Sequence, residues 1–171
     1  MGTSAGFATA DSAVWTASSH IILIFLTLIC ASSGSTSGGI KIDRFILFWK
    51  LVRLKVKRTI HPNIVDTVRI DGRAMNPDHA RDAMLFVVFY LVIVSASSLA
   101  LTVTGVNFLE AFTGSAACMG NVGPGLGAVG SMGNYAGLPG LSKLILCLVM
   151  VVGRLEIFVF ILPFTRGFWK K

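Results

Sequence analysis

Charged residues are absent from three long stretches of this sequence. No Asp, Glu, Lys or Arg occurs in residues 12–40, 83–109 or 111–142, and charged residues make up only 13% of the chain. An ordinary globular domain contains about 25% charged residues. A membrane span needs about 20 mostly apolar residues, so each stretch is long enough to hold one. Because Met84–Val103 also lacks the polar face of a soluble helix, the sequence predicts an integral membrane protein.

The residue clusters that mark enzymes and metal sites are also missing. The three cysteines have neither metal-type nor disulfide-type spacing, and the three histidines are isolated. No phosphate-binding loop and no pairing of a nucleophile with a base can be recognised in the sequence. We therefore expect no enzyme activity and no organic cofactor in this chain.

The basic residues that are present predict an orientation across the membrane. Ten of the fifteen Lys and Arg residues lie between Lys41 and Arg81, and three more lie close to the C-terminus. Because Lys and Arg collect on the cytoplasmic side, we expect these two regions inside. Residues 104–138 and the N-terminal dozen are then outside. An anionic lipid surface suits the basic residues, whereas a nucleic-acid partner is not expected because no recognition motif accompanies them.

Predicted helices alternate with glycine-rich segments along the chain. Helical patterns cover, in order, residues 12–30, 40–58, 77–103, 107–120 and 141–164. Glycine-rich segments that cannot form stable helices lie at residues 2–11, 31–39 and 120–140. In the basic region, Val68–Met75 predicts a small hairpin with Asp71 and Gly72 as its turn.

The segment from Asn107 to Gly120 predicts a helix that is too short to cross a membrane. Asn107 and Glu110 resemble a capping box at its start, with Asn in place of the usual Ser or Thr. A dozen residues rise ~18 Å, roughly half of the hydrocarbon core. Glycines then end the helix, and irregular backbone at this depth needs protein or water as its hydrogen-bond partner.

A short helix that ends in glycines within the membrane favours a cation. Its carbonyl end carries a partial negative charge, and a glycine turn can present carbonyl oxygens that replace the water shell of the ion. A flexible outer loop over Gly120–Gly140 is the alternative. A second glycine turn, Gly2–Phe7, also precedes an inward-running helix, and this internal repeat favours the ion path.

Three motifs in combination resemble the bacterial Trk/Ktr potassium-uptake family. They are NVGPGLG at residues 121–127, GRLEI at 153–157 and SSGSTSGGIK at 32–41. Members of this family are similar to four fused potassium-channel pore units, each with an outer helix, a pore helix, a selectivity filter and an inner helix. The resemblance implies an all-α membrane protein with re-entrant glycine-rich loops and a small cytoplasmic hairpin. It covers only the C-terminal part of such a protein, so we expect a fragment whose Met1 falls where the third pore helix ends.

The resemblance divides the chain into three parts and implies two filters. Residues 1–58 are the end of the third unit, 59–76 a cytoplasmic hairpin linker, and 77–171 a complete fourth unit. Potassium, the transported ion, is expected to bind at two filter segments: Ser4, Ala5 and Gly6, and Asn121, Val122 and Gly123. Family members often have Thr at the places of Ser4 or Ala5, a change that keeps the backbone oxygens but alters the side chains.

A gate below the filters is also implied by the resemblance. Its loop consists of Gly34, Ser35, Thr36, Ser37, Gly38 and Gly39, and Arg154 of the GRLEI motif projects beside it. For Arg154, the alternative is an arginine packed between helices and hydrogen-bonded to carbonyls. For the loop, the alternative is a position in the cytoplasm, since residues 12–30 already reach ~28 Å as a helix. The apolar residues that follow Ile40 favour a loop within the membrane.

These expectations describe a multi-pass pore subunit that carries potassium, or sodium, across the cell (inner) membrane. The family resemblance implies a homodimer and a cytoplasmic nucleotide-binding ring as regulatory partner, for which the basic face Lys50–Arg73 is the expected docking surface. That face would suit lipid equally well. A non-conducting assembly or anchoring subunit, whose glycines only pack helices, is the alternative function. Because four filter segments surround one ion and this chain supplies two, we expect no conduction by the chain alone.

Overall fold

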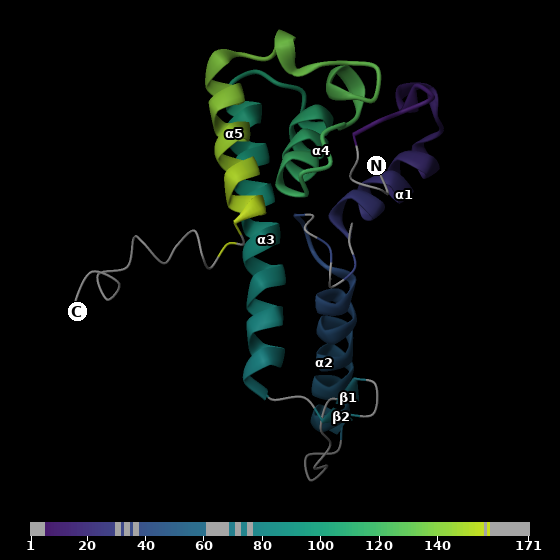
Figure 1. The fold of residues 1–171 in the computed structure, drawn as a ribbon, viewed down its shortest axis with the longest axis vertical. Coiled ribbons are helices and arrows are strands. Elements are labelled where there is room, and N and C mark those ends of the chain that lie inside the picture. Colours follow the sequence, from purple (N-terminus) through teal and green to yellow (C-terminus); the bar gives the residue numbers. More distant parts are fainter. Residues whose placement is uncertain are drawn as a thin grey trace, which may run out of the picture.

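Helices make up most of the chain in the computed structural model, which describes residues 6–29, 32, 35, 38–60, 69–70, 73–74, 77–155 and 157 (Figure 1). The elements in chain order are η1 (Ser12–Val14), α1 (Ala17–Leu28), α2 (Ile42–Ile60), β1 (Arg69–Ile70), β2 (Arg73–Ala74), α3 (Pro77–Val103), α4 (Phe108–Met119), η2 (Gly127–Val129), η3 (Tyr135–Gly137) and α5 (Gly140–Arg154). Strands β1 and β2 pair antiparallel, with Ile70 opposite Arg73. This confirms the predicted hairpin, although its turn lies outside the described residues.

The long helix α3 is the axis around which the other helices are arranged (Figure 1). Helices α4 and α5 pack along the half of α3 near its C-terminal end, and α2 runs beside the other half. Helix α4 also contacts α1, so that it lies between α5 on one side and α1 on the other. The short helix α4 is therefore surrounded by other helices of the chain.

Helix α3 is apolar on all sides. Its segment Arg81–Val103 is, among the described residues, the one helix long and apolar enough to cross a membrane, with a mean hydropathy of 2.4. One such helix is weak evidence by itself, because the core helix of a soluble protein can have the same composition. However, only 39% of this segment is buried within the chain, which leaves most of its apolar surface for other contacts.

Helix α4 is almost completely enclosed from Ala111 to its C-terminal end. Its buried residues are Ala111, Thr113, Gly114, Ser115, Ala116, Ala117, Cys118 and Met119. Because most of these side chains are small, the backbones of α3 and α5 can approach α4 closely. The C-terminal end of α4 consequently lies in the interior of the described chain, where Met119 has no exposed surface.

Local sequence signals explain where helices α3 and α1 begin. Helix α3 begins at Pro77 and ends at Val103, as predicted from its uninterrupted apolar run. Helix α1 begins at Ala17 rather than near Ser12, because Asp11 caps a separate 3₁₀ turn by accepting a hydrogen bond from Ala13 N at 2.9 Å. Helix α1 is therefore shorter than the helix predicted over residues 12–30.

The predicted capping box of α4 is half right. The Asn107 side chain caps the helix by accepting a hydrogen bond from Leu109 N at 3.3 Å. Glu110 does not complete the box as expected: its Oε1 instead accepts a hydrogen bond from Ala128 N at 3.0 Å. The acid thus joins the first turn of α4 to η2.

Helix α5 covers the first part of the predicted helix over residues 141–164. Its last residue is Arg154, and Leu155 caps it with a hydrogen bond from its N–H to the Val151 carbonyl at 3.0 Å. Ile157 is again helical, and the rest of the predicted helix lies outside the described residues. The glycine at position 153 weakens the last turn, because Gly costs a helix about 1 kcal/mol relative to Ala.

Candidate functional site

The chain reverses direction at the C-terminal end of α4. Asn121 N donates to the Cys118 carbonyl at 3.1 Å, and Val122 N donates to the Ala117 carbonyl at 2.9 Å. Asn121 and Gly123 both have left-handed backbone conformations, with φ of 53° and 99°. Asparagine tolerates this conformation and glycine adopts it freely, so the sequence Asn-Val-Gly is suited to this turn.

The first predicted filter meets this turn. A Cβ atom on Gly6 would lie 3.6 Å from the carbonyl oxygen of Val122, and Gly6 itself has a left-handed φ of 75°. The structure therefore brings Gly6 together with Val122, although they belong to opposite ends of the chain. Ser4 and Ala5, the other two residues predicted for this filter, lie outside the described residues.

The residues on either side of the loop predicted as a gate are hydrogen-bonded to each other. Ile40 N donates a hydrogen bond to the Leu28 carbonyl, the last residue of α1, at 3.3 Å. Near the end of the loop, Gly38 and Gly39 are buried, and Gly39 has a left-handed φ of 89°. Ser35 is half-buried, whereas Gly34, Thr36 and Ser37 lie outside the described residues.

Gly38 lies where an added side chain would be crowded on several sides. A Cβ atom there would lie 2.7 Å from Asn121 Nδ2 and 3.1 Å from the carbonyl oxygens of Met119 and Gly153. Three parts of the chain therefore meet at Gly38: the end of α4, the turn after it, and the last turn of α5. Two of the segments predicted to act together, the loop and the filter, are in contact here.

The motif GRLEI reaches the same place through its glycine. A Cβ atom on Gly153 would overlap the Met119 carbonyl oxygen, so only glycine allows α5 to approach the end of α4 this closely. Arg154 is the next residue, and its side chain is exposed in this chain. The structure thus brings Gly153 and Gly38 together and places the positive charge of Arg154 one residue away.

Three polar side chains hold the turn, and two of them, Thr113 and Tyr135, were not singled out from the sequence. Asn121 Nδ2 donates to the Met150 carbonyl of α5 at 3.4 Å, a long hydrogen bond. Thr113 Oγ1 accepts a hydrogen bond from Leu126 N at 3.1 Å. The Tyr135 hydroxyl donates to the Gly123 carbonyl at 2.6 Å. A signal for Tyr135 was available, since it is the one aromatic residue between positions 113 and 157.

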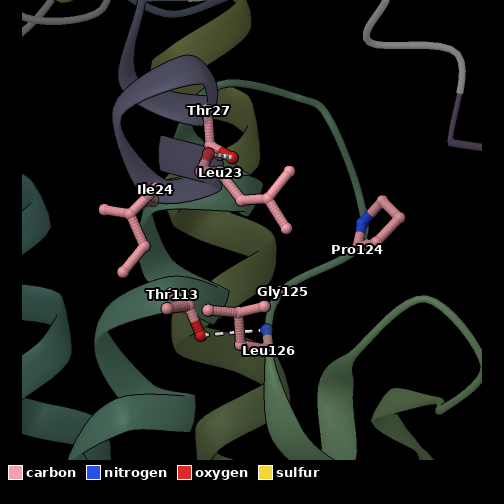
Figure 2. A pocket seen from close by; sticks show the side chains of 8 residues that line it. Leu23, Ile24, Thr27, Thr113, Pro124, Gly125 and Leu126 are labelled. Carbon is pink, nitrogen blue, oxygen red and sulfur yellow. Dashed lines mark hydrogen bonds between the residues drawn. The ribbon is translucent and has the colours of Figure 1, made fainter. Parts of the chain in front are cut away.

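A small cavity separates α1 from the segment that follows the turn (Figure 2). Its volume is about 10 Å³, and its lining residues are Leu23, Ile24, Thr27, Thr113, Ala116, Pro124, Gly125 and Leu126. Figure 2 shows the hydrogen bond from Leu126 N to the Thr113 hydroxyl at its edge. A single water needs about this volume, so the cavity has no room for an organic substrate. It is a packing gap between α1 and α4.

Comparison with known proteins gives the chain a family. The model of the TrkH family, described as cation transport protein, matches residues 1–170. Trk system potassium uptake protein TrkI from Halomonas elongata is 36% identical over 170 residues, which are 99% of this chain and 35% of that protein. Trk system potassium uptake protein TrkH from Escherichia coli K12 is 36% identical over 172 residues, which are 100% of this chain and 35% of that protein.

A solved structure shows the same fold. The crystal structure of the potassium transporter TrkH from Vibrio parahaemolyticus matches with a TM-score of 0.86 and 34% identity, covering 99% of this chain and 36% of that one. This chain therefore spans about a third of the length of the relatives it matches. Since the family model and the relatives match along nearly its entire length, the chain belongs to the TrkH family of cation transport proteins, which are membrane transporters.

Proposed function

We propose that this chain supplies two filter segments, and the gate below them, to a transporter that carries potassium across the cell membrane. The observation that carries this proposal is the contact of Gly6 with the Val122 carbonyl at the end of α4. Two glycine-containing turns from distant parts of the chain are in contact there. The names of the relatives, which are potassium uptake proteins, indicate the ion.

The chemistry of the turn at the end of α4 suits weak binding of a cation during conduction rather than tight binding. The C-terminal end of α4 carries a partial negative charge of about half an elementary charge. The turn adds backbone carbonyl oxygens, the ligands that replace the water shell of a potassium ion. Residues 111–142 contain no Asp or Glu, so no carboxylate is available there to bind the ion strongly. Weak binding to several oxygens is what conduction requires.

The loop that ends at Gly39 and the charge of Arg154 form the proposed gate. Gly38 is buried against the carbonyl oxygens of Met119 and Gly153, directly at the end of α4. This position favours a loop at membrane depth over a cytoplasmic loop. A positive charge one residue beyond Gly153 repels cations, and the charge leaves the path when the loop and α5 separate.

Exposed basic residues in the second half of α2 support the proposal of a cytoplasmic partner. The side chains of Lys50, Arg53, Lys55, Lys57 and Arg58 are all exposed. On this proposal they face the cytoplasm and form the docking surface for a nucleotide-binding ring, while the whole protein pairs with a second copy of itself. The same residues would contact anionic lipid headgroups near the membrane surface.

Substitution of Gly123 by alanine tests the filter proposal. No atom lies within 4 Å of a Cβ placed on Gly123, so the methyl group has room. The left-handed φ of 99° costs an L-residue about 1–2 kcal/mol, which the turn relieves by moving its carbonyls. In the whole protein as its gene encodes it, Gly123→Ala should lower the preference for potassium over sodium in ion flux into vesicles.

Gly105 provides a matched control. It also has a left-handed φ, 91°, and no atom lies within 4 Å of a Cβ placed on it, but it lies in the connection between α3 and α4. Gly105→Ala therefore imposes the same backbone strain away from the turn and should leave the preference unchanged. Equal preferences in both variants would remove the turn from the filter.

A further inference from the structure

Tyr135 lies across one face of α4 and reaches the turn beyond it. Its ring is close to Gly114, where a Cβ atom would lie 3.8 Å from Tyr135 Cε1. One turn further along α4, the Cys118 thiol is 4.0 Å from the Tyr135 hydroxyl. The absence of a side chain at Gly114 thus makes room for the ring, and the hydroxyl extends past the end of the helix to the Gly123 carbonyl at 2.6 Å.

The peptide group between Gly123 and Pro124 has only one hydrogen-bonding atom. Proline has no N–H, so the carbonyl oxygen of Gly123 is the only polar atom of this peptide that can be held. Gly123 has a left-handed φ of 99°, and even a Cβ added there would have no atom within 4 Å, so packing does not restrain it. The N–H of Gly123 is 3.5 Å from the Ala117 carbonyl, at the limit of a hydrogen bond. The orientation of this peptide therefore depends on Tyr135.

Tyr135 is itself held firmly. It opens the 3₁₀ turn η3, which Asn134 caps by accepting a hydrogen bond from Ala136 N at 3.0 Å. Lys143 Nζ, in the first turn of α5, donates to the Ala136 carbonyl at 2.7 Å. The hydroxyl is thus presented to Gly123 from a turn that is fastened to α5, and not from a free loop.

We propose that Tyr135 is a selectivity-determining positioning residue: its hydroxyl fixes the Gly123–Pro124 peptide and so keeps the carbonyls of Val122 and Gly123 in the spacing that suits potassium. This inference rests on the proposed filter function of the turn. A carbonyl oxygen has two lone pairs, so the bond from Tyr135 leaves one available. Without the hydroxyl, the peptide can rotate about the glycine and the turn can close around a smaller ion.

Tyr135→Phe in the whole protein tests the inference, because it removes the hydroxyl and keeps the ring. Potassium and sodium flux are measured on the same vesicles, so their ratio does not depend on how much protein is inserted. The preference for potassium should fall roughly three- to tenfold, the change expected for the loss of one hydrogen bond. The chain contains one other tyrosine, Tyr90 in α3, and Tyr90→Phe makes the same chemical change there and should keep the preference.

A second substitution keeps the hydroxyl and separates donation from bulk. Replacement of Tyr135 by 3-fluorotyrosine, whose hydroxyl stays largely protonated at neutral pH, retains a donor at the same place, and the potassium preference should be retained. Loss of the preference with this residue, or its retention in Tyr135→Phe while Gly123→Ala loses it, would overturn the role of Tyr135 and leave the filter proposal standing. Retention in both Tyr135→Phe and Gly123→Ala would overturn the filter proposal itself.

Discussion

Glu110 Oε1 accepts a hydrogen bond from the backbone N–H of Ala128 at 3.0 Å, and a Cβ on the neighbouring Gly127 would lie 2.8 Å from the same oxygen. The carboxylate in the first turn of α4 is therefore fitted closely to the 3₁₀ turn η2. Thr113, one turn further along α4, binds Leu126 N in the same manner. Two side chains of α4 thus hold the returning segment along the helix, and the turn at Asn121–Gly123 lies at the far end of that pairing.

Replacement of Glu110 tests whether its role is to accept this hydrogen bond. Glu110→Ala should lower the stability of the protein by about 1–2 kcal/mol, because a backbone donor loses a charged acceptor at a partly exposed place. Glu110→Gln keeps an oxygen at this position and should lose less. Thermal unfolding of the purified protein in detergent measures both. An equal loss in the two variants would show that the charge near the N-terminus of α4 is what matters, and not the acceptor.

Substitution of Gly38 by alanine should open the proposed gate. The added Cβ would meet Asn121 Nδ2 at 2.7 Å and two backbone carbonyl oxygens at 3.1 Å, so it strains the contact between the loop and the end of α4. Overpacking of this kind costs about 1–3 kcal/mol, and the cost falls on the closed arrangement. Resting potassium flux through the whole protein should therefore rise several-fold. Gly137→Ala, where no atom lies within 4 Å of the added Cβ, is the control and should keep the flux of the natural protein.

Removal of the charge at Arg154 should also raise resting flux. Arg154→Ala takes away the positive charge that follows Gly153 at the end of α5, whereas Arg154→Lys keeps it. We expect several-fold higher potassium flux in vesicles for the alanine variant and near-normal flux for the lysine variant. An unchanged rate in Arg154→Ala would exclude a barrier role and support an arginine that only packs between helices.

Local patterns predicted the elements of this fold well. Pro77 and the apolar run that follows it predicted both ends of α3, and Asn107 predicted the start of α4. These predictions succeed because helix starts and stops depend on interactions within a few residues. The hairpin of β1 and β2 was likewise predicted from its turn residues. The interruption of the helical pattern at Leu155 was not predicted, because the contact of Gly153 with Met119 that precedes it is not visible in the sequence.

The arrangement of the candidate site depends on contacts that the sequence does not reveal. The glycine content of the segment after Met119 predicted the turn that contains Asn121, Val122 and Gly123, and the family resemblance singled out these three residues as a filter. Their contact with Gly6 and with Gly38 joins segments far apart in the chain, and no local periodicity encodes such a meeting. Glu110 was assigned to a cap because a backbone N–H near it in the sequence was assumed to be its donor, whereas packing brought the N–H of Ala128 to its carboxylate.

The hydrogen bond between Ile40 N and the Leu28 carbonyl has a consequence for how the loop between them can move. Because the two ends of the loop are fastened to each other, the loop can change its shape without separating α1 from α2. On the proposed gating role, such a movement would change the contacts that Gly38 makes with the end of α4 and would leave the joined flanks in place. Opening by this route would be a local rearrangement of the loop rather than a tilting of whole helices within the bilayer.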